Sequence, residues 1–135
     1  SPGLEANMLL EEIAAKLKRS RDPRTGAPMV GDITVSRSAF HGDMLANAPD
    51  LIVGYMPGYR SSWQTALGAV PAVTVDDNTE AWRADHCIDS RFVPGVLIEN
   101  RSSREPNPRL VDLTVSLMRE FNVASGQGMI GHSIY

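Results

Sequence analysis

The sequence predicts an α/β fold in which a short mixed sheet is combined with an N-terminal and a C-terminal helix. Apolar residues recur at helical spacing near both ends of the chain. Two short apolar runs, 51–55 and 95–99, have the composition of core strands. The chain has 135 residues, of which 42% are apolar and 21% charged, so its size and composition are those of a globular domain. We therefore expect residues 1–135 to form a single domain.

The first predicted element is a helix that begins near Pro2 and ends near Arg21. Its apolar stripe consists of Leu10, Ile13, Ala14 and Leu17. Residues 22–26 read Asp-Pro-Arg-Thr-Gly, a turn signal that ends the helix. Residues 32–36 then alternate between polar and apolar, which predicts a strand with one wet face. Residues 50–55 form a continuous apolar run, which is typical of a central strand buried on both faces.

The second half of the chain contains two further strand candidates, at 72–75 and 95–99. A final helix is predicted to start with Asn107 as its cap and Pro108 in its first turn. The apolar stripe of this helix consists of Leu110, Leu113, Leu117, Met118 and Phe121. After it we expect a loose, glycine-rich tail in which Met129 and Ile130 are available to dock.

Charge and cysteine content exclude several classes of protein. Thirteen basic and sixteen acidic residues give a net charge of −3, which offers no bulk attraction for nucleic-acid phosphates or anionic lipids. The single cysteine, Cys87, excludes an internal disulfide framework. No apolar run approaches the roughly 18 residues that span a bilayer, and residues 1–3 do not begin a signal-peptide pattern. We expect a soluble chain, and its start at Ser1 suggests a trimmed form or a piece of a longer protein.

Metal-capable side chains are densest at Asp85, His86 and Cys87. Adjacent side chains of an extended segment point in opposite directions, so they do not readily bind one ion together. From spacing alone, His86 is either a surface histidine or one ligand of a metal site whose other ligands come from elsewhere in the fold. A buried, inert role is favoured for Cys87 over a reactive thiol. His41 and His132 lie in glycine-flanked loops, where we expect exposed histidines.

Three sequence blocks occur in a specific order. The first reads Asn-Ala-Pro-Asp-Leu-Ile-Val-Gly-Tyr at 47–55 and Gly-Tyr-Arg-Ser-Ser-Trp at 58–63, and the second has Asp-Asn-Thr at 77–79 with Ala-Trp at 81–82. The third reads Asp-His-Cys-Ile-Asp at 85–89 and Val-Pro-Gly-Val-Leu at 93–97. Together they resemble the C-terminal third of a type I phosphodiesterase/nucleotide pyrophosphatase-like protein of the alkaline phosphatase superfamily. The similarity extends over nearly the whole chain through the turn at 22–26, Pro108, Asp112, Phe121 to Val123 and the tail at 128–134.

The resemblance implies a partial alkaline phosphatase-like sandwich and a metal-dependent phosphodiesterase or phosphohydrolase acting on a phosphate ester. In that family a Thr or Ser nucleophile attacks phosphorus with the help of two divalent metals, usually zinc. His86 matches the last metal-ligand histidine. Asp85 matches the middle residue of the same motif, whose carboxylate at most orients the ligand imidazole or holds the loop. No segment matches the nucleophile or the other ligands, so this chain contains no catalytic residue. The resemblance therefore implies a chain that is inactive alone, with zinc or another divalent metal bound once the N-terminal part of the same protein completes the site.

Arg60 has two interpretations. Its planar guanidinium is suited to clamp a substrate phosphate, or it fixes the loop by pairing with a carboxylate. The neighbouring Tyr55, Tyr59 and Trp63 could stack on a substrate base, although covering a sheet edge is the more usual role of aromatic residues in such a loop.

A different class of function remains open. The chain is alternatively a non-catalytic interaction or assembly module. The predicted strands at 51–55 and 95–99 would then expose apolar sheet edges, which favour self-association into a homo-oligomer.

Overall fold

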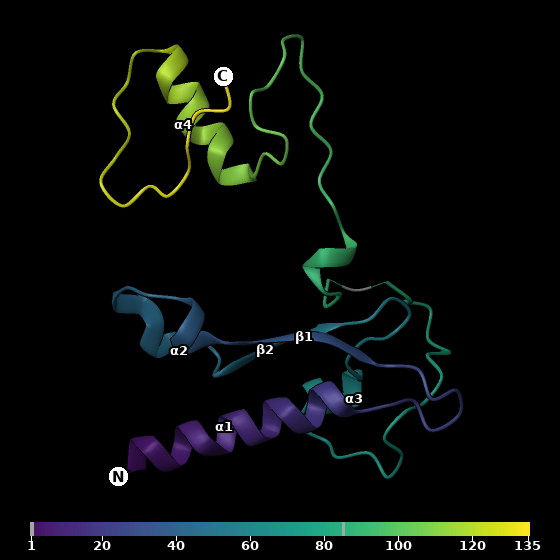
Figure 1. Ribbon diagram of the computed structural model, residues 1–135. Helices are drawn as coiled ribbons and strands as arrows, with labels where there is room; N and C mark the ends of the chain where they lie inside the picture. The colour runs from purple at the N-terminus through teal and green to yellow at the C-terminus, as the bar shows by residue number, and fades with distance from the viewer. Residues whose placement is uncertain (1, 85) are drawn as a thin grey trace. The chain divides into compact units, whose positions relative to one another are not determined.

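The computed structural model describes residues 2–84 and 86–135, which fall into two compact units, Ser1–Gly95 and Val96–Tyr135 (Figure 1). Among the described residues, the first unit contains three α-helices and a two-stranded antiparallel sheet, and the second is built around one α-helix. The predicted mixture of helices and strands is therefore confirmed.

Helix α1 (Pro2–Arg19) is the predicted N-terminal helix. It ends just before the turn, where the backbone N–H of Gly26 donates to the carbonyl of Asp22 at 2.8 Å. Gly26 has a φ of 74°, a left-handed conformation that glycine adopts without a steric penalty. The predicted turn is thus confirmed, and it leads the chain back toward β1.

Strand β1 (Val30–Val35) pairs antiparallel with β2 (Leu51–Tyr55), with Ile33 opposite Val53. Helix α1 packs against β1 (Figure 1). Between the strands lie the short helix α2 (Ser36–Ala39) and a 3₁₀ turn, Asp43–Asn47. On its other side β2 has one isolated parallel bridge, between Tyr55 and Ile88.

The prediction that β2 is buried on both faces is wrong within the described residues. Its residues are half-buried, and Ile52 is exposed. A strand becomes central only when a neighbour pairs along each side. Here β1 covers one edge, whereas the other edge has a single bridge.

Two predicted strands do not form among the described residues. Residues 72–75 follow α3 (Trp63–Ala66) as a series of bends, and residues 95–99 run as irregular chain. Val96 and Ile98 are 87% and 90% exposed. Both segments have the composition of strands, but neither pairs with a neighbouring strand among the described residues. An apolar segment becomes part of a sheet only through such pairing.

Helix α4 (Leu110–Glu120) begins two residues later than predicted. The backbone of Arg109 is extended, and its N–H donates to the Asp112 carboxylate at 2.8 Å. Asp112 thereby stabilises the helix start, a role that the sequence analysis gave to Asn107. The buried face of α4 is formed by Asp112, Val115 and Ser116, whereas Leu110 and Phe121 of the predicted apolar stripe are 82% and 77% exposed.

Residues 131–135 cover this buried face. Ile134 is fully buried, while Ile130 is exposed, so the docked apolar side chain is a different one from those predicted. A Cβ at Gly131 would collide with the carbonyl group of Val111, 2.7 Å from its carbon. Glycine at position 131 therefore allows this segment to lie directly on the helix backbone.

Candidate functional site

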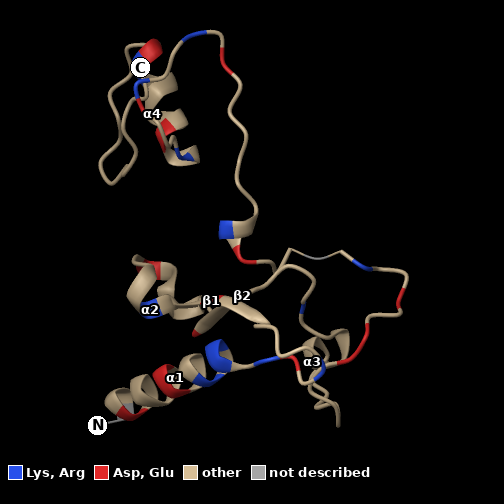
Figure 2. Cartoon of the chain, turned by 45° about the vertical axis from the view of Figure 1, so that its right-hand side comes forward, with Lys and Arg blue, Asp and Glu red and all other residues tan. Residues whose placement is uncertain are grey.

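Three segments of the first unit are joined by side-chain and backbone hydrogen bonds. They are the turn at 22–27, the residues 55–63 at the end of β2 and in the loop that follows it, and the described residues of the segment 82–89. We call them the loop cluster. The residues that the sequence analysis singled out, His86 and Arg60, both belong to it. Basic and acidic residues are interspersed along the chain around it (Figure 2).

His86 immediately precedes a short piece of chain that pairs with the end of β2. The N–H of Tyr55 donates to the Cys87 carbonyl at 2.9 Å, and the N–H of Asp89 donates to the Tyr55 carbonyl at 2.9 Å. This bridge fixes the backbone next to His86, whose side chain is exposed. Cys87 is half-buried. Asp85, the predicted supporting carboxylate, lies outside the described residues.

Arg60 connects the loop after β2 with the segment that leads to His86. Its Nη1 donates to the carbonyl oxygens of Trp82 and Ala84 at 3.3 and 3.4 Å. Its guanidinium also lies 5.0 Å from the centre of the Trp63 ring, within the range of a cation–π contact. Arg60 therefore has a loop-fixing role, and these contacts made through backbone carbonyls were not foreseen. A contact between Arg60 and a substrate phosphate stays a prediction.

Asp22 connects the turn with the same loop and was not recognised from the sequence. The Tyr59 hydroxyl donates to its Oδ2 at 2.9 Å, and the Arg24 backbone N–H donates to its Oδ1 at 2.8 Å. These hydrogen bonds, the Arg24 backbone bond first, lower the pKa of the Asp22 carboxyl. The guanidinium of Arg24 also forms a bidentate pair with Asp77, with both N–O distances at 2.9 Å. Only the turn motif itself hinted at this arrangement.

Asp89 is the second carboxylate that the sequence analysis missed. It is 5% exposed and packs against two glycines of the sheet, Gly31 and Gly54. A Cβ at Gly54 would lie 2.9 Å from the Cα of Asp89, closer than real side chains approach. Arg91 donates to the carboxylate through Nη2 at 2.6 Å and also through its backbone N–H, and these bonds lower the pKa of Asp89 to about 2. Gly54 within the predicted strand at 50–55 was the signal for this close approach.

The donor set of the described residues does not make a complete metal centre. No group of three or more His, Cys, Asp or Glu side chains in the described ranges is arranged to hold an ion. Protein zinc sites have three or four protein ligands, so His86 would supply one of them. The predicted ligand role of His86 and supporting role of Asp85 stay predictions.

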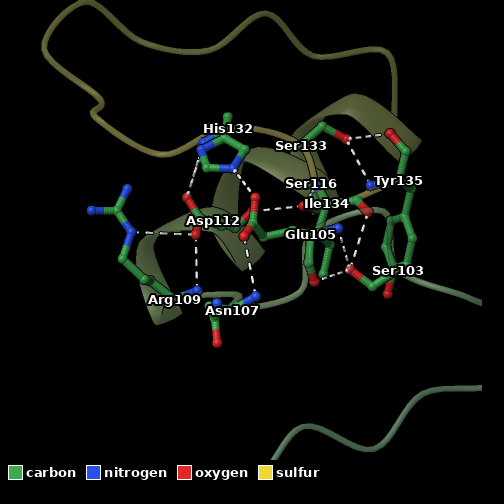
Figure 3. A network of polar contacts seen from close by, with 10 residues as sticks. All are labelled: Ser103, Glu105, Asn107, Arg109, Asp112, Ser116, His132, Ser133, Ile134 and Tyr135. Atoms are coloured by element: carbon green, nitrogen blue, oxygen red, sulfur yellow. Dashed lines mark hydrogen bonds and ion pairs between the residues drawn. The ribbon is translucent and has the colours of Figure 1, made fainter.

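A second polar cluster lies in the other unit, around His132 (Figure 3). The ring lies between the carboxylates of Asp112 and Glu105. His132 is exposed over about half of its side chain, as its loop position predicts, but its two carboxylate partners were not foreseen. His41 is exposed, as expected.

Comparisons with known proteins identify no relative of this chain. No family model matches the chain, and no curated protein or solved structure is significantly similar to it. Within the described ranges, no helix combines the length and apolar character needed to cross a membrane. The loop cluster with His86 and Arg60 is therefore the feature on which a functional proposal can be built.

Proposed function

We propose that this chain is the C-terminal part of a metal-dependent phosphodiesterase or phosphohydrolase of the alkaline phosphatase superfamily, and that it contributes the last metal-ligand histidine, His86. One observation supports this proposal above the others. The first block is joined by hydrogen bonds to the other two, which follow it in the sequence. Arg60 of the first block donates to the carbonyl of Trp82 in the second block and to that of Ala84, and Tyr55 pairs with Cys87 and Asp89 of the third.

The proposal extends to the fold. In an alkaline phosphatase-like sandwich, β1, β2 and the bridged segment 87–89 would be part of a larger sheet. The parallel bridge beside an antiparallel pair is consistent with a mixed sheet. The exposed apolar residues at 96–98 would then find strand partners outside this chain.

The chemistry assigned to this chain is limited to metal binding. A neutral imidazole is a good zinc ligand, and divalent metals in such enzymes activate a nucleophile and stabilise negative charge on the phosphoryl group. Because the described residues do not complete a metal centre, no catalytic step is assigned to this chain alone. We place the nucleophile and the other ligands in the N-terminal part of the same protein.

A paramagnetic metal tests the ligand assignment. Co²⁺ is added to the isotopically labelled chain, and broadening of the ring signals of its three histidines is compared. We expect broadening to be strongest at His86 and at the neighbouring loop cluster, and to disappear from that cluster in His86→Ala but not in His41→Ala. Equal broadening of His41 and His86 would show generic binding to surface histidines and would contradict the assignment.

Activity assays test the second half of the proposal. The chain should hydrolyse neither p-nitrophenyl phosphate nor bis-p-nitrophenyl phosphate, with or without zinc. Turnover that is lost in His86→Ala would show that a nucleophile is already present, and would overturn its placement outside this chain.

A non-catalytic assembly module is the second candidate, and a specific observation favours it. Large apolar side chains are exposed on α1, at residues 96–98 and on α4. Surfaces of this kind usually mark sites of association when they are contiguous. This alternative predicts a homo-oligomer that forms without metal or substrate.

A further inference from the structure

The His132 ring lies between two carboxylates (Figure 3). Its Nδ1 lies 3.3 Å from Oδ1 of Asp112, a buried residue of α4. Its Nε2 lies 3.1 Å from Oε2 of Glu105, in the chain that leads into this helix. Nε2 is therefore at hydrogen-bond distance from Glu105, and Nδ1 is at ion-pair distance from Asp112.

The protonation state of the ring decides whether both contacts are favourable. A neutral imidazole has one N–H donor and one lone pair, so it can donate to only one of the two carboxylates. The other nitrogen would then direct a lone pair at a carboxylate oxygen. An imidazolium always has an N–H for Glu105 and carries a positive charge, so it donates to Glu105 and attracts both carboxylates at once.

The same residues attach residues 131–135 to α4. The backbone N–H of His132 donates to Asp112 Oδ1 at 3.1 Å, and that of Ile134 donates to the Ser116 hydroxyl at 3.0 Å. The Ile134 carbonyl accepts from the Arg104 N–H at 2.7 Å, and its side chain is fully buried. Attachment of this segment thus depends on backbone bonds, one buried side chain and the ring contacts of His132.

We infer that residues 131–135 form a pH-sensitive clasp on α4, which is closed most firmly while His132 is protonated and both Asp112 and Glu105 are ionised. Loss of the imidazolium proton removes the charge that attracts both carboxylates. Lowering the pH far enough to protonate the carboxylates also weakens the clasp. Hydrogen bonds lower the pKa of Asp112 to about 2, mainly the one from the Arg109 N–H, and the His132 contact lowers the pKa of Glu105.

The other charged groups of this unit do not replace the imidazolium. Arg109 lies 3.5 Å from the opposite oxygen of Asp112 and remains charged throughout this pH range. Arg101 stacks on the Tyr135 ring and pairs with Glu120, and the Tyr135 hydroxyl donates to Glu99. Among the described groups at the clasp, His132 is thus the cation that lies between the two carboxylates when it is protonated. Opening the clasp would uncover Ile134 and the Val115 and Ser116 side of α4.

Amide hydrogen exchange of the full chain tests the clasp. Protection factors of the His132 and Ile134 amides are measured from about pH 5 to about pH 8 and corrected for the intrinsic pH dependence of exchange. Because the ring is partly exposed, we expect both protection factors to fall about two- to fivefold over this range. The Val53 amide in β2 serves as an internal reference and should show no such fall.

Variants assign the response to the ring. His132→Gln should abolish the pH dependence of the two clasp amides, whereas the matched control His41→Gln should retain it. A flat profile in the wild-type chain, or an unchanged profile in His132→Gln, would overturn the proposal. If His132→Gln also deprotects the amides of α4, Glu105→Gln is decisive, because it keeps the ring and the Asp112 contact at the helix start. If the clasp is pH-sensitive, the protection factors of the His132 and Ile134 amides depend less on pH in Glu105→Gln than in the wild-type chain. An unchanged pH dependence in Glu105→Gln would refute the proposal.

Discussion

At the scale of single residues, buried carboxylates fasten the loops of both units. Asp22, Asp89 and Asp112 are each at most 5% exposed, and each accepts at least one backbone N–H. Burying a carboxylate is costly unless it is hydrogen-bonded or paired, and all three also lie beside an arginine. These residues therefore stabilise the fold only while they are ionised.

Asp89 should contribute to stability in a pH-dependent way. Its pKa is about 2 in the folded chain against an ordinary value of 3.8, so its ionised form is favoured by folding. The contribution is complete above the ordinary value and is lost as the pH falls toward about 2. We expect Asp89→Asn to lower the melting temperature near neutral pH, and the gap to the wild-type chain to narrow in this acid range.

Thermal unfolding followed by circular dichroism at a series of pH values measures this gap. Asp43→Asn is the control, because Asp43 is exposed in the 3₁₀ turn that precedes β2. A gap between Asp89→Asn and wild type that stays constant down to about pH 2 would show that ionisation of Asp89 is not the cause.

Arg60 should protect the segment before His86 from proteolysis. Its bonds to the Trp82 and Ala84 carbonyls flank Arg83, an exposed trypsin site. In Arg60→Gln we expect cleavage after Arg83 to become severalfold faster, because the segment is no longer held on both sides of the scissile bond. Peptide mass spectrometry follows the cleavage, and the exposed Arg37 site in α2 provides the reference rate. Equal acceleration at both sites would indicate general loosening instead of a local role for Arg60.

At the scale of elements, local patterns were predictable and pairing was not. Helix α1, the turn at 22–26, β1 and β2 follow from periodicity and turn chemistry over a few neighbouring residues. The strands expected at 72–75 and 95–99 depend on partners distant in sequence, which composition does not reveal. The start of α4 moved because the Asp112 side chain reaches the Arg109 N–H, a contact that competes with the simpler cap expected at Asn107.

The candidate site was predictable to a smaller degree. The sequence identified His86 and Arg60 and grouped the surrounding blocks by resemblance. It did not reveal that Arg60 acts on carbonyl groups, that Tyr59 bonds to Asp22, or that Asp89 lies against the sheet glycines. Such contacts depend on the three-dimensional approach of segments 20 or more residues apart, and a linear pattern encodes them weakly.

Gly54→Ala tests the contact between β2 and the segment that follows His86. The new methyl group would meet backbone and side-chain atoms of Asp89 at 2.9 Å, so one of the two paired segments must shift. We expect a loss of about 1–3 kcal/mol in the free energy of unfolding, the usual cost of overpacking. Urea unfolding measures it, with Gly95→Ala as control because nothing lies within 4 Å of a Cβ there. Equal stability of the two variants would refute this close packing.

At the scale of the whole molecule, two descriptions compete. As part of a larger phosphohydrolase, the chain would bury its apolar strand residues in a sheet that other segments complete. As an assembly module, it would bury them against further copies of itself. The exposure of Val96 and Ile98 is compatible with both, and the oligomeric state distinguishes them.

The assembly module predicts reversible self-association that depends on residues 96–98. Sedimentation velocity over a range of concentrations should show oligomers of the wild-type chain and fewer of them in Val96→Ser/Ile98→Ser, because the apolar area available for burial is smaller. Leu67→Ser is the matched control, since Leu67 is 86% exposed but lies in a different loop. A chain that remains monomeric at all concentrations would count against the module, and oligomers unaffected by the double variant would exclude this segment as the contact.

The two tryptophans of the chain, Trp63 and Trp82, both belong to the loop cluster. One lies beside the Arg60 guanidinium, and the backbone carbonyl of the other accepts from the same side chain. The unit at 96–135 contains no tryptophan. Tryptophan fluorescence, excited selectively, is therefore an optical reporter of the loop cluster alone, and ligand titrations near His86 can be followed by this emission without attaching a dye.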